Sequence, residues 1–130
     1  MKTEIPAKQN DTCLIFHTRD EMTKVRLDKV AYFEADGNYT TVMFANGYKT
    51  SLLVNLLMIE KLIDDTLRGK VQPFIRIGKR YIVNSTCICH INTLKQRLVL
   101  SDFNSPNVFT LSISKEALKN LKELVGILKN

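Results

Sequence analysis

Two turn signals that follow each other closely constrain this chain more than any other feature. Asp36-Gly37-Asn38 and Asn46-Gly47 offer residues that accept positive φ, and runs of largely alternating apolar and polar residues flank both. Asn-Gly between such runs is the strongest short-range signal for a β-hairpin. We therefore expect strands at residues 30–35, 39–45 and 48–52.

Short apolar runs continue on both sides of these hairpins. Further strands are expected at residues 12–18, 23–27, 87–94, 97–102 and 108–113, and two short aliphatic segments, residues 74–77 and 81–83, flank a Gly-Lys-Arg tip. Asn55 and Ser114 are suitable N-caps for two helices. Apolar residues recur at helical spacing after each cap: Leu56, Ile59, Ile63 and Leu67 after the first, and Leu118, Leu121, Val125 and Leu128 after the second. The total is a mainly β domain of about seven or eight short strands with two short helices.

The chain has 130 residues, which is enough for one domain with a real core. Residues 1–11 are polar and predict a flexible tail, which leaves residues 12–130 as a single domain. Three cysteines without disulfide-style spacing indicate a reducing compartment. No signal peptide is evident, and the longest apolar segment, residues 52–63, is too short to span a bilayer. A cytoplasmic protein without a membrane partner is expected.

Positive charge is concentrated in the second half of the sequence. Residues 66–130 hold eleven basic and three acidic residues, a net charge of +8 in a chain whose total is +6. No acidic residue occurs from Thr66 to Ser101, where seven cations lie: Arg68, Lys70, Arg76, Lys79, Arg80, Lys95 and Arg97. A solvated surface normally mixes both signs, so this basic stretch favours a polyanionic partner.

Signatures of catalysis are missing from the sequence. It contains no phosphate-binding glycine loop, no His-Glu-x-x-His and no Gly-x-Ser-x-Gly. Cys87-x-Cys89-His90 resembles a metal motif, but alternation on a strand would separate the histidine from the cysteines, and no second pair of ligands exists. We therefore expect no enzyme activity, no cofactor and no bound metal.

Aromatic residues are spread over all the expected strands, which fits core packing better than a base-stacking platform. A module that binds single-stranded nucleic acid or RNA is thus an alternative to one that binds duplex DNA. A protein-interaction domain with an acidic partner is a second alternative.

Four segments in the right order resemble the LytTR family of bacterial DNA-binding domains. They are Lys29-Val-Ala-Tyr-Phe-Glu-Ala-Asp-Gly-Asn-Tyr-Thr41, the apolar pattern of residues 55–63, Phe74-x-Arg76-Ile77-x-x-x-Tyr81-Ile82-Val83-Asn84, and Leu111-Ser-Ile-Ser114-Lys115. The resemblance covers residues 24–126. It implies an elongated, multi-stranded β-fold that presents loops to DNA, and a sequence-specific transcription regulator as the function.

Matched positions imply a set of DNA-binding residues: Asn38, Tyr39, Thr40, Thr41, Arg76, Gly78, Lys79, Arg80, Ser114 and Lys115. Three positions depart from the family pattern. The family usually has His at Gly78 and Ser at Arg80, and Lys115 replaces an Arg, so the DNA sequence preference is expected to differ.

Some roles stay open at this point. Arg76 can make either an ion pair within the fold or a phosphate contact. Lys79 and Arg80 are expected to lack a carboxylate partner, because the nearest acids in sequence are Asp65 and Asp102. Asn84 is expected to bond local backbone rather than a base.

One module of this size contacts too few base pairs to single out a genomic site, so we expect two copies on repeated half-sites, forming a dimer on DNA. Domains of this family usually follow a receiver or a membrane segment, and this sequence shows neither. The expectation is a stand-alone regulator without a receiver, with an excised response-regulator output domain as the other possibility.

Overall fold

The computed structural model describes residues 12–129, with side chains as far as Gly126. The predicted tail at residues 1–11 and the side chain of Leu128 lie outside the described part. In chain order the elements are β1 (Cys13–His17), β2 (Met22–Arg26), the 3-10 helix η1 (Leu27–Lys29), β3 (Val30–Asp36), β4 (Tyr39–Phe44), β5 (Lys49–Leu52), α1 (Leu56–Thr66), β6 (Phe74–Ile77), β7 (Tyr81–Asn84), the 3-10 helix η2 (Ser85–Cys87), β8 (Ile88–Asn92), β9 (Arg97–Leu100), β10 (Phe109–Ser112) and α2 (Lys115–Lys129).

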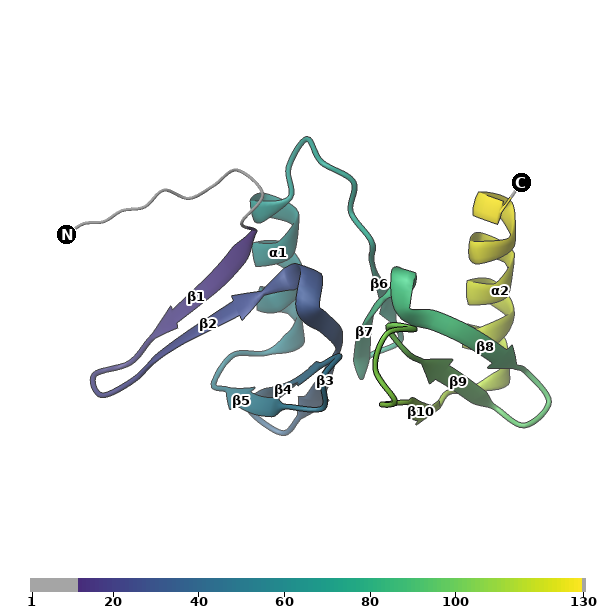
Figure 1. Cartoon of the computed structure of the whole chain (residues 1–130), viewed down its shortest axis with the longest axis horizontal. Coiled ribbons are helices and arrows are strands. Elements are labelled where there is room, and N and C mark those ends of the chain that lie inside the picture. Colours follow the sequence, from purple (N-terminus) through teal and green to yellow (C-terminus); the bar gives the residue numbers. More distant parts are fainter. Residues whose placement is uncertain (1–11, 130) are drawn as a thin grey trace.

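The predicted mainly β fold with two α-helices is confirmed, and Figure 1 shows its elongated shape. The described residues form ten strands rather than seven or eight. The number is higher because every short apolar run between two turn signals pairs as a separate strand, including four-residue strands such as β6 and β7.

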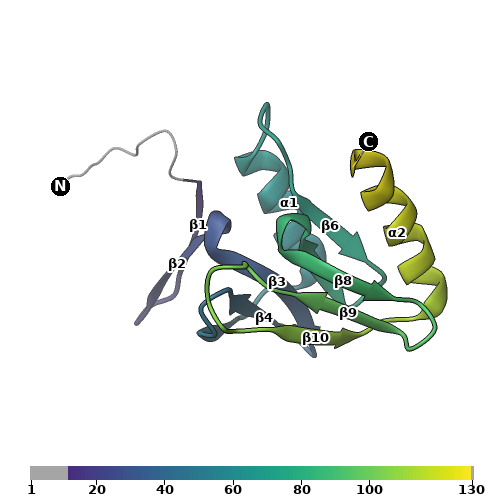
Figure 2. The same cartoon turned by 45° about the vertical axis from the view of Figure 1, so that its right-hand side comes forward.

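The strands form three antiparallel sheets. The largest has the order β5-β4-β3-β7-β6, while β10-β9-β8 and β1-β2 form smaller sheets. Figures 1 and 2 show α1 beside the β1–β2 hairpin and α2 at the opposite end of the molecule, beside β8 and β9. The five-stranded sheet lies between these two parts.

A hydrophobic core fills each face of the five-stranded sheet. Phe33 and Ile82 belong to the core that includes α1, whereas their neighbours Tyr32 and Val83 belong to the core that includes the three-stranded sheet and α2. Successive side chains of a strand point to opposite faces, so a strand that is covered on both faces along its whole length has all of its residues buried. All four residues of β7 are accordingly buried.

Local sequence signals explain where several elements begin and end. Asn55 caps α1 as expected, because its side chain accepts a hydrogen bond from the Met58 amide at 2.8 Å. Gly37 has φ +63° and closes the β3–β4 turn, a conformation that costs glycine little. Several expected strand ends differ from the structure by one or two residues. Cys87, for example, ends the 3-10 helix η2 rather than starting a strand, because the Asn84 side chain accepts a hydrogen bond from the Thr86 amide and begins that helix.

Candidate nucleic-acid interface

The β3–β4 turn and the β6–β7 turn lie at the same end of the five-stranded sheet. Glu34 pairs with Tyr81 across β3 and β7, and the Ala35 amide donates to the Arg80 carbonyl at 2.8 Å. Because the two strands are antiparallel, the end of β3 meets the start of β7. The fold therefore brings Asn38 of the first turn and residues 78–80 of the second turn together at this end of the sheet.

The start of α2 lies against the β6–β7 hairpin. A groove of about 180 Å³ is lined by Gly78 on one side and by Ala117 and Leu121 of α2 on the other. The hydroxyl oxygen of Ser114 accepts a hydrogen bond from the Ala117 amide at 3.2 Å, as expected of an N-cap. Ser114 and Lys115 are therefore positioned about one helical turn from residues that contact the hairpin.

A further segment, the β8–β9 turn, joins the start of α2. The Ile113 amide donates to the Gln96 carbonyl at 3.1 Å, which ties the turn to the residue before Ser114. Lys95 and Arg97 flank Gln96, are exposed, and have no ion-pair partner among the described residues. The site prediction omitted them. Their membership of the acid-free stretch was the available signal, but it did not reveal their proximity to α2.

Lys79 and Arg80, the cations at the tip of the β6–β7 hairpin (residues 78–80), were expected to lack a carboxylate partner, and Arg80 contradicts this expectation. Its Nε and Nη2 atoms both donate to Oε2 of Glu34, at 2.9 and 2.7 Å. Its guanidinium also lies over the Tyr81 ring, 5.4 Å from the centroid. The expectation failed because pairing of β3 with β7, and not proximity in sequence, places Glu34 beside the tip.

The carboxylate of Glu34 is partly shielded from solvent. The Glu34 side chain is 23% exposed, against 66% for Arg80. Burial raises the pKa of Tyr81 above its ordinary value, and the Glu34 carboxylate raises it further, since a second negative charge nearby is unfavourable. The pKa of Tyr32 is raised by the same two causes.

Arg76 makes the ion pair within the fold that was one of its two expected roles. Nη1 donates to Oε1 of Glu60 on α1 at 2.8 Å, and Nε donates to the Gly78 carbonyl at 2.8 Å. Arg76 thus fastens α1 to β6 and supports the β6–β7 turn from within. Its guanidinium uses two of its donor atoms in these bonds.

Thr40 does not fit the prediction that it faces DNA. It is fully buried, and its hydroxyl donates to the Val54 carbonyl at 2.8 Å. Alternation along β4 explains this, because Thr40 shares a face with the core residue Val42. Its neighbour Thr41 is half-buried on the other face and lines a shallow pocket with Glu34 and Arg80.

Other predicted residues are open to solvent. Asn38, Tyr39, Gly78, Lys79, Ser114 and Lys115 are all exposed. Lys79 and Lys115 have no ion-pair partner among residues 12–126. Gly78 has φ +60°, so the tip turn uses a conformation that other residues adopt only with strain.

The acid-free stretch in the sequence is not free of acids in space. Arg68 pairs with Asp65 at 3.1 Å, and Arg76 and Arg80 pair with carboxylates from α1 and β3. Lys70, Lys79, Lys95 and Arg97 remain without a carboxylate partner in the described part of the chain. Three of these four lie on the β6–β7 and β8–β9 turns or at their edges.

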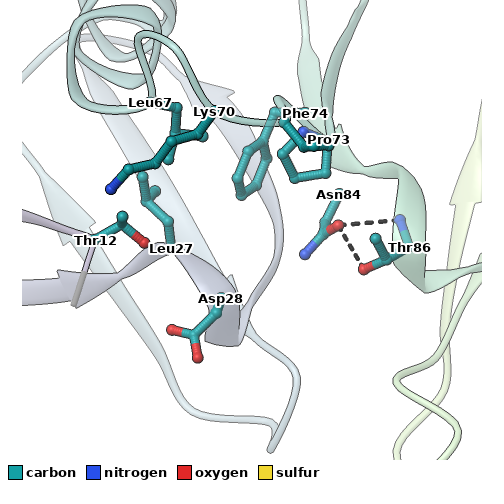
Figure 3. A pocket seen from close by; sticks show the side chains of 10 residues that line it. Thr12, Leu27, Asp28, Leu67, Lys70, Pro73, Phe74, Asn84 and Thr86 are labelled. Carbon is teal, nitrogen blue, oxygen red and sulfur yellow. Dashed lines mark hydrogen bonds between the residues drawn. The ribbon is translucent and has the colours of Figure 1, made fainter. Parts of the chain in front are cut away.

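A pocket of about 380 Å³ lies away from this end, between η1 and the segment that leads into β6. Figure 3 shows Asn84 at its wall, where the Asn84 side-chain oxygen accepts hydrogen bonds from the amide and the hydroxyl of Thr86. The Asn84 amide group also donates to the Val30 carbonyl at 2.9 Å. Asn84 therefore satisfies backbone and neighbouring groups, as expected, and belongs to the scaffold.

The cysteines do not form a metal-binding arrangement in the described residues, where no group of three or more His, Cys, Asp or Glu side chains converges. Cys87 is buried, and burial raises the pKa of its thiol, whereas Cys89 is exposed. None of the helices within residues 12–129 has both the length and the apolar character that crossing a bilayer requires.

A family model described as the LytTr DNA-binding domain matches residues 20–126 of the sequence. The chain belongs to the LytTR family. The LytTr DNA-binding domain of a Bacillus cereus response regulator has a similar structure, with a TM-score of 0.63 and 22% sequence identity over 88% of this chain and 97% of that one. No curated protein matches the sequence. The matched family model describes a DNA-binding domain.

In this LytTR domain, Gly78 and Arg80 are two of the three positions expected to depart from the family pattern. They lie in the same turn, and Arg80 is the cation that Glu34 holds. The change at Arg80 adds a guanidinium at the edge where the expected DNA-facing turns meet.

Proposed function

We propose that this LytTR domain is a sequence-specific transcription regulator that acts in the cytoplasm on double-stranded DNA. The proposed interface comprises the β3–β4 turn, the β6–β7 turn and the junction of β10 with α2, to which we add the β8–β9 turn. Asn38, Tyr39, Lys79, Arg80 and Lys115 are its proposed contacts. Phosphate contacts would position the domain, and base contacts would give specificity.

The proposal is supported above all by the clustering of unpaired cations on segments that are distant in sequence. The four are Lys79, Lys95, Arg97 and Lys115. They come from the β6–β7 turn, the β8–β9 hairpin and the start of α2, and hydrogen bonds and groove contacts link these segments together. All four are exposed. A polyanion is the partner that such a cluster attracts.

Aromatic side chains favour duplex DNA over single strands. Tyr32 packs edge-on against Tyr81 and Phe109, with ring centroids 6.0 and 5.9 Å apart, so these rings are used in the core. The exposed rings lie on three separate segments: Tyr39 begins β4, Tyr48 lies between β4 and β5, and Phe103 lies between β9 and β10. A stacking platform needs neighbouring exposed rings on one face.

The test is a competition titration of the purified protein with duplex DNA, single strands of the same sequence, and heparin. Duplex DNA should compete best. If all four unpaired cations neutralise phosphates, log K should fall with log salt with a slope of about −3 to −4. A flat salt dependence, or preference for single strands, would contradict the duplex proposal, and preference for heparin would indicate non-specific charge binding.

Target sites should contain repeated half-sites occupied by two copies. One domain alone cannot discriminate against the roughly 10⁶–10⁹ competing sites of a genome. Fragments selected from genomic DNA by the protein would define the site, and analytical ultracentrifugation of the complex would count the copies. One protein per high-affinity site would refute this part of the proposal.

A further inference from the structure

Three contacts hold Arg80 in one direction at the proposed interface. Two side-chain nitrogens donate to one oxygen of Glu34, at 2.9 and 2.7 Å, and the guanidinium lies over the Tyr81 ring at 5.4 Å. The backbone of Arg80 is fixed as well, since its carbonyl accepts from the Ala35 amide. An arginine on a three-residue turn would otherwise lose considerable rotamer freedom on binding.

The bonds to Glu34 leave the outer end of the guanidinium available. Nε and one N–H of Nη2 face the carboxylate, so both N–H groups of Nη1 and the second N–H of Nη2 remain. No described residue accepts from them in the hydrogen bonds of this structure. Two adjacent parallel donors match O6 and N7 of guanine in the major groove.

Generic affinity for DNA does not explain the position of Glu34. A carboxylate beside phosphates repels them, so Glu34 should weaken binding to every sequence alike. The repulsion between Glu34 and the phosphates is offset only at a DNA site where Glu34 improves a contact that Arg80 makes. Such an improvement comes from fixing the direction of a planar, bidentate donor.

We propose that Glu34 is a positioning residue for guanine recognition: it holds Arg80 so that the free end of the guanidinium reads one guanine in the duplex. This inference rests on the proposed function and adds the base and the residue pair that read it. It assigns to Glu34 a role in specificity at the cost of some affinity for all DNA.

A selected duplex and a set in which each guanine is replaced in turn provide the test. Dissociation constants would be measured for the parent protein, Arg80→Ala, Glu34→Gln, Glu34→Met and the double variant Glu34→Met/Arg80→Ala. Asp36→Asn is the matched control, because it removes a negative charge from the same strand without a hydrogen bond to Arg80.

At one guanine the parent should discriminate by roughly 5- to 150-fold. Glu34→Gln should lose part of this ratio and Glu34→Met most of it, while binding to scrambled duplex stays equal or tightens. Arg80→Ala should lose the same ratio, and adding Glu34→Met to it should change the ratio no further. Asp36→Asn should keep the ratio of the parent.

Two readouts separate positioning from a merely structural role. Melting curves should show that all variants are folded. In the absence of DNA, the NMR signal of the Arg80 Nε–H should be sharp in the parent, whereas in Glu34→Met this proton should exchange rapidly with water.

If Glu34→Met keeps full discrimination, the inference is refuted. It is also refuted if the variant tightens matched and scrambled DNA by the same factor with the ratio unchanged, because Glu34 would then only mask Arg80. If the parent prefers no duplex, the proposed function itself fails, and the inference fails with it.

Discussion

Replacing Thr40 by valine tests whether this residue belongs to the scaffold or to the DNA-facing surface. The substitution keeps the shape and the β-branch but removes the hydroxyl that donates to the Val54 carbonyl at 2.8 Å. Thr40 is fully buried, so the Val54 carbonyl loses a partner that water cannot easily replace. A net hydrogen bond contributes about 1 kcal/mol, and an unsatisfied buried group costs about 1–3 kcal/mol.

We therefore expect Thr40→Val to lower the free energy of unfolding by about 1–2 kcal/mol, and Tm by roughly 3–8 °C. Urea unfolding followed by circular dichroism measures the first quantity, and a thermal melt the second. Affinity for duplex DNA should remain within twofold of the parent when it is measured well below Tm.

Thr41→Val is the matched control, because Thr41 is half-buried and its hydroxyl makes no hydrogen bond among those of the described residues. Its stability should change by less than about 0.5 kcal/mol. The reasoning is refuted if Thr40→Val is as stable as the parent. A stable Thr40→Val that binds duplex more than tenfold weaker would return Thr40 to the interface.

Three further results are expected. Arg76→Gln should destabilise the fold by about 1–3 kcal/mol in urea unfolding, because it leaves Glu60 without its ion pair, and equal stability would show that the pair is dispensable. Lys79→Ala and Lys115→Ala should each reduce the salt slope of duplex binding by about 0.9 with no change in base preference, and an unchanged slope would remove that residue from the phosphate contacts. Burial and Glu34 raise the pKa of Tyr81, so the folded state favours the protonated phenol, and stability should fall as pH rises above the ordinary tyrosine value of 10.0. Tyr81→Phe should make this alkaline loss of stability shallower in unfolding titrations. An identical pH profile of the variant and the parent would contradict the reasoning.

Local patterns were sufficient to predict most of the fold. Asn46-Gly47 and Asn55 act within a few residues of their own positions, one by closing a hairpin and the other by capping α1. Alternation along the strands also held the information that Thr40 is buried, since Val42 two residues later is an evident core residue. The family pattern outweighed that signal and placed Thr40 in the interface.

Contacts across the sheet could not be read from the sequence. Glu34 and Arg80 are 46 residues apart, and only the register of β3 with β7 brings them together. The same holds for Gln96 and Ile113, whose backbone bond places Lys95 and Arg97 beside α2. A count of charges along the chain describes its composition correctly but not which charges neutralise one another.

The β6–β7 turn is anchored on β7, whose four residues are all buried between two cores. Binding surfaces made of long loops must become ordered when a ligand arrives, and this ordering opposes association. Here the residues 78–80 and 37–38 are short closures of paired strands, so their order is already established by folding. A domain built in this way should recognise its target as a rigid body, and adaptation should occur mainly in the shape of the bound DNA.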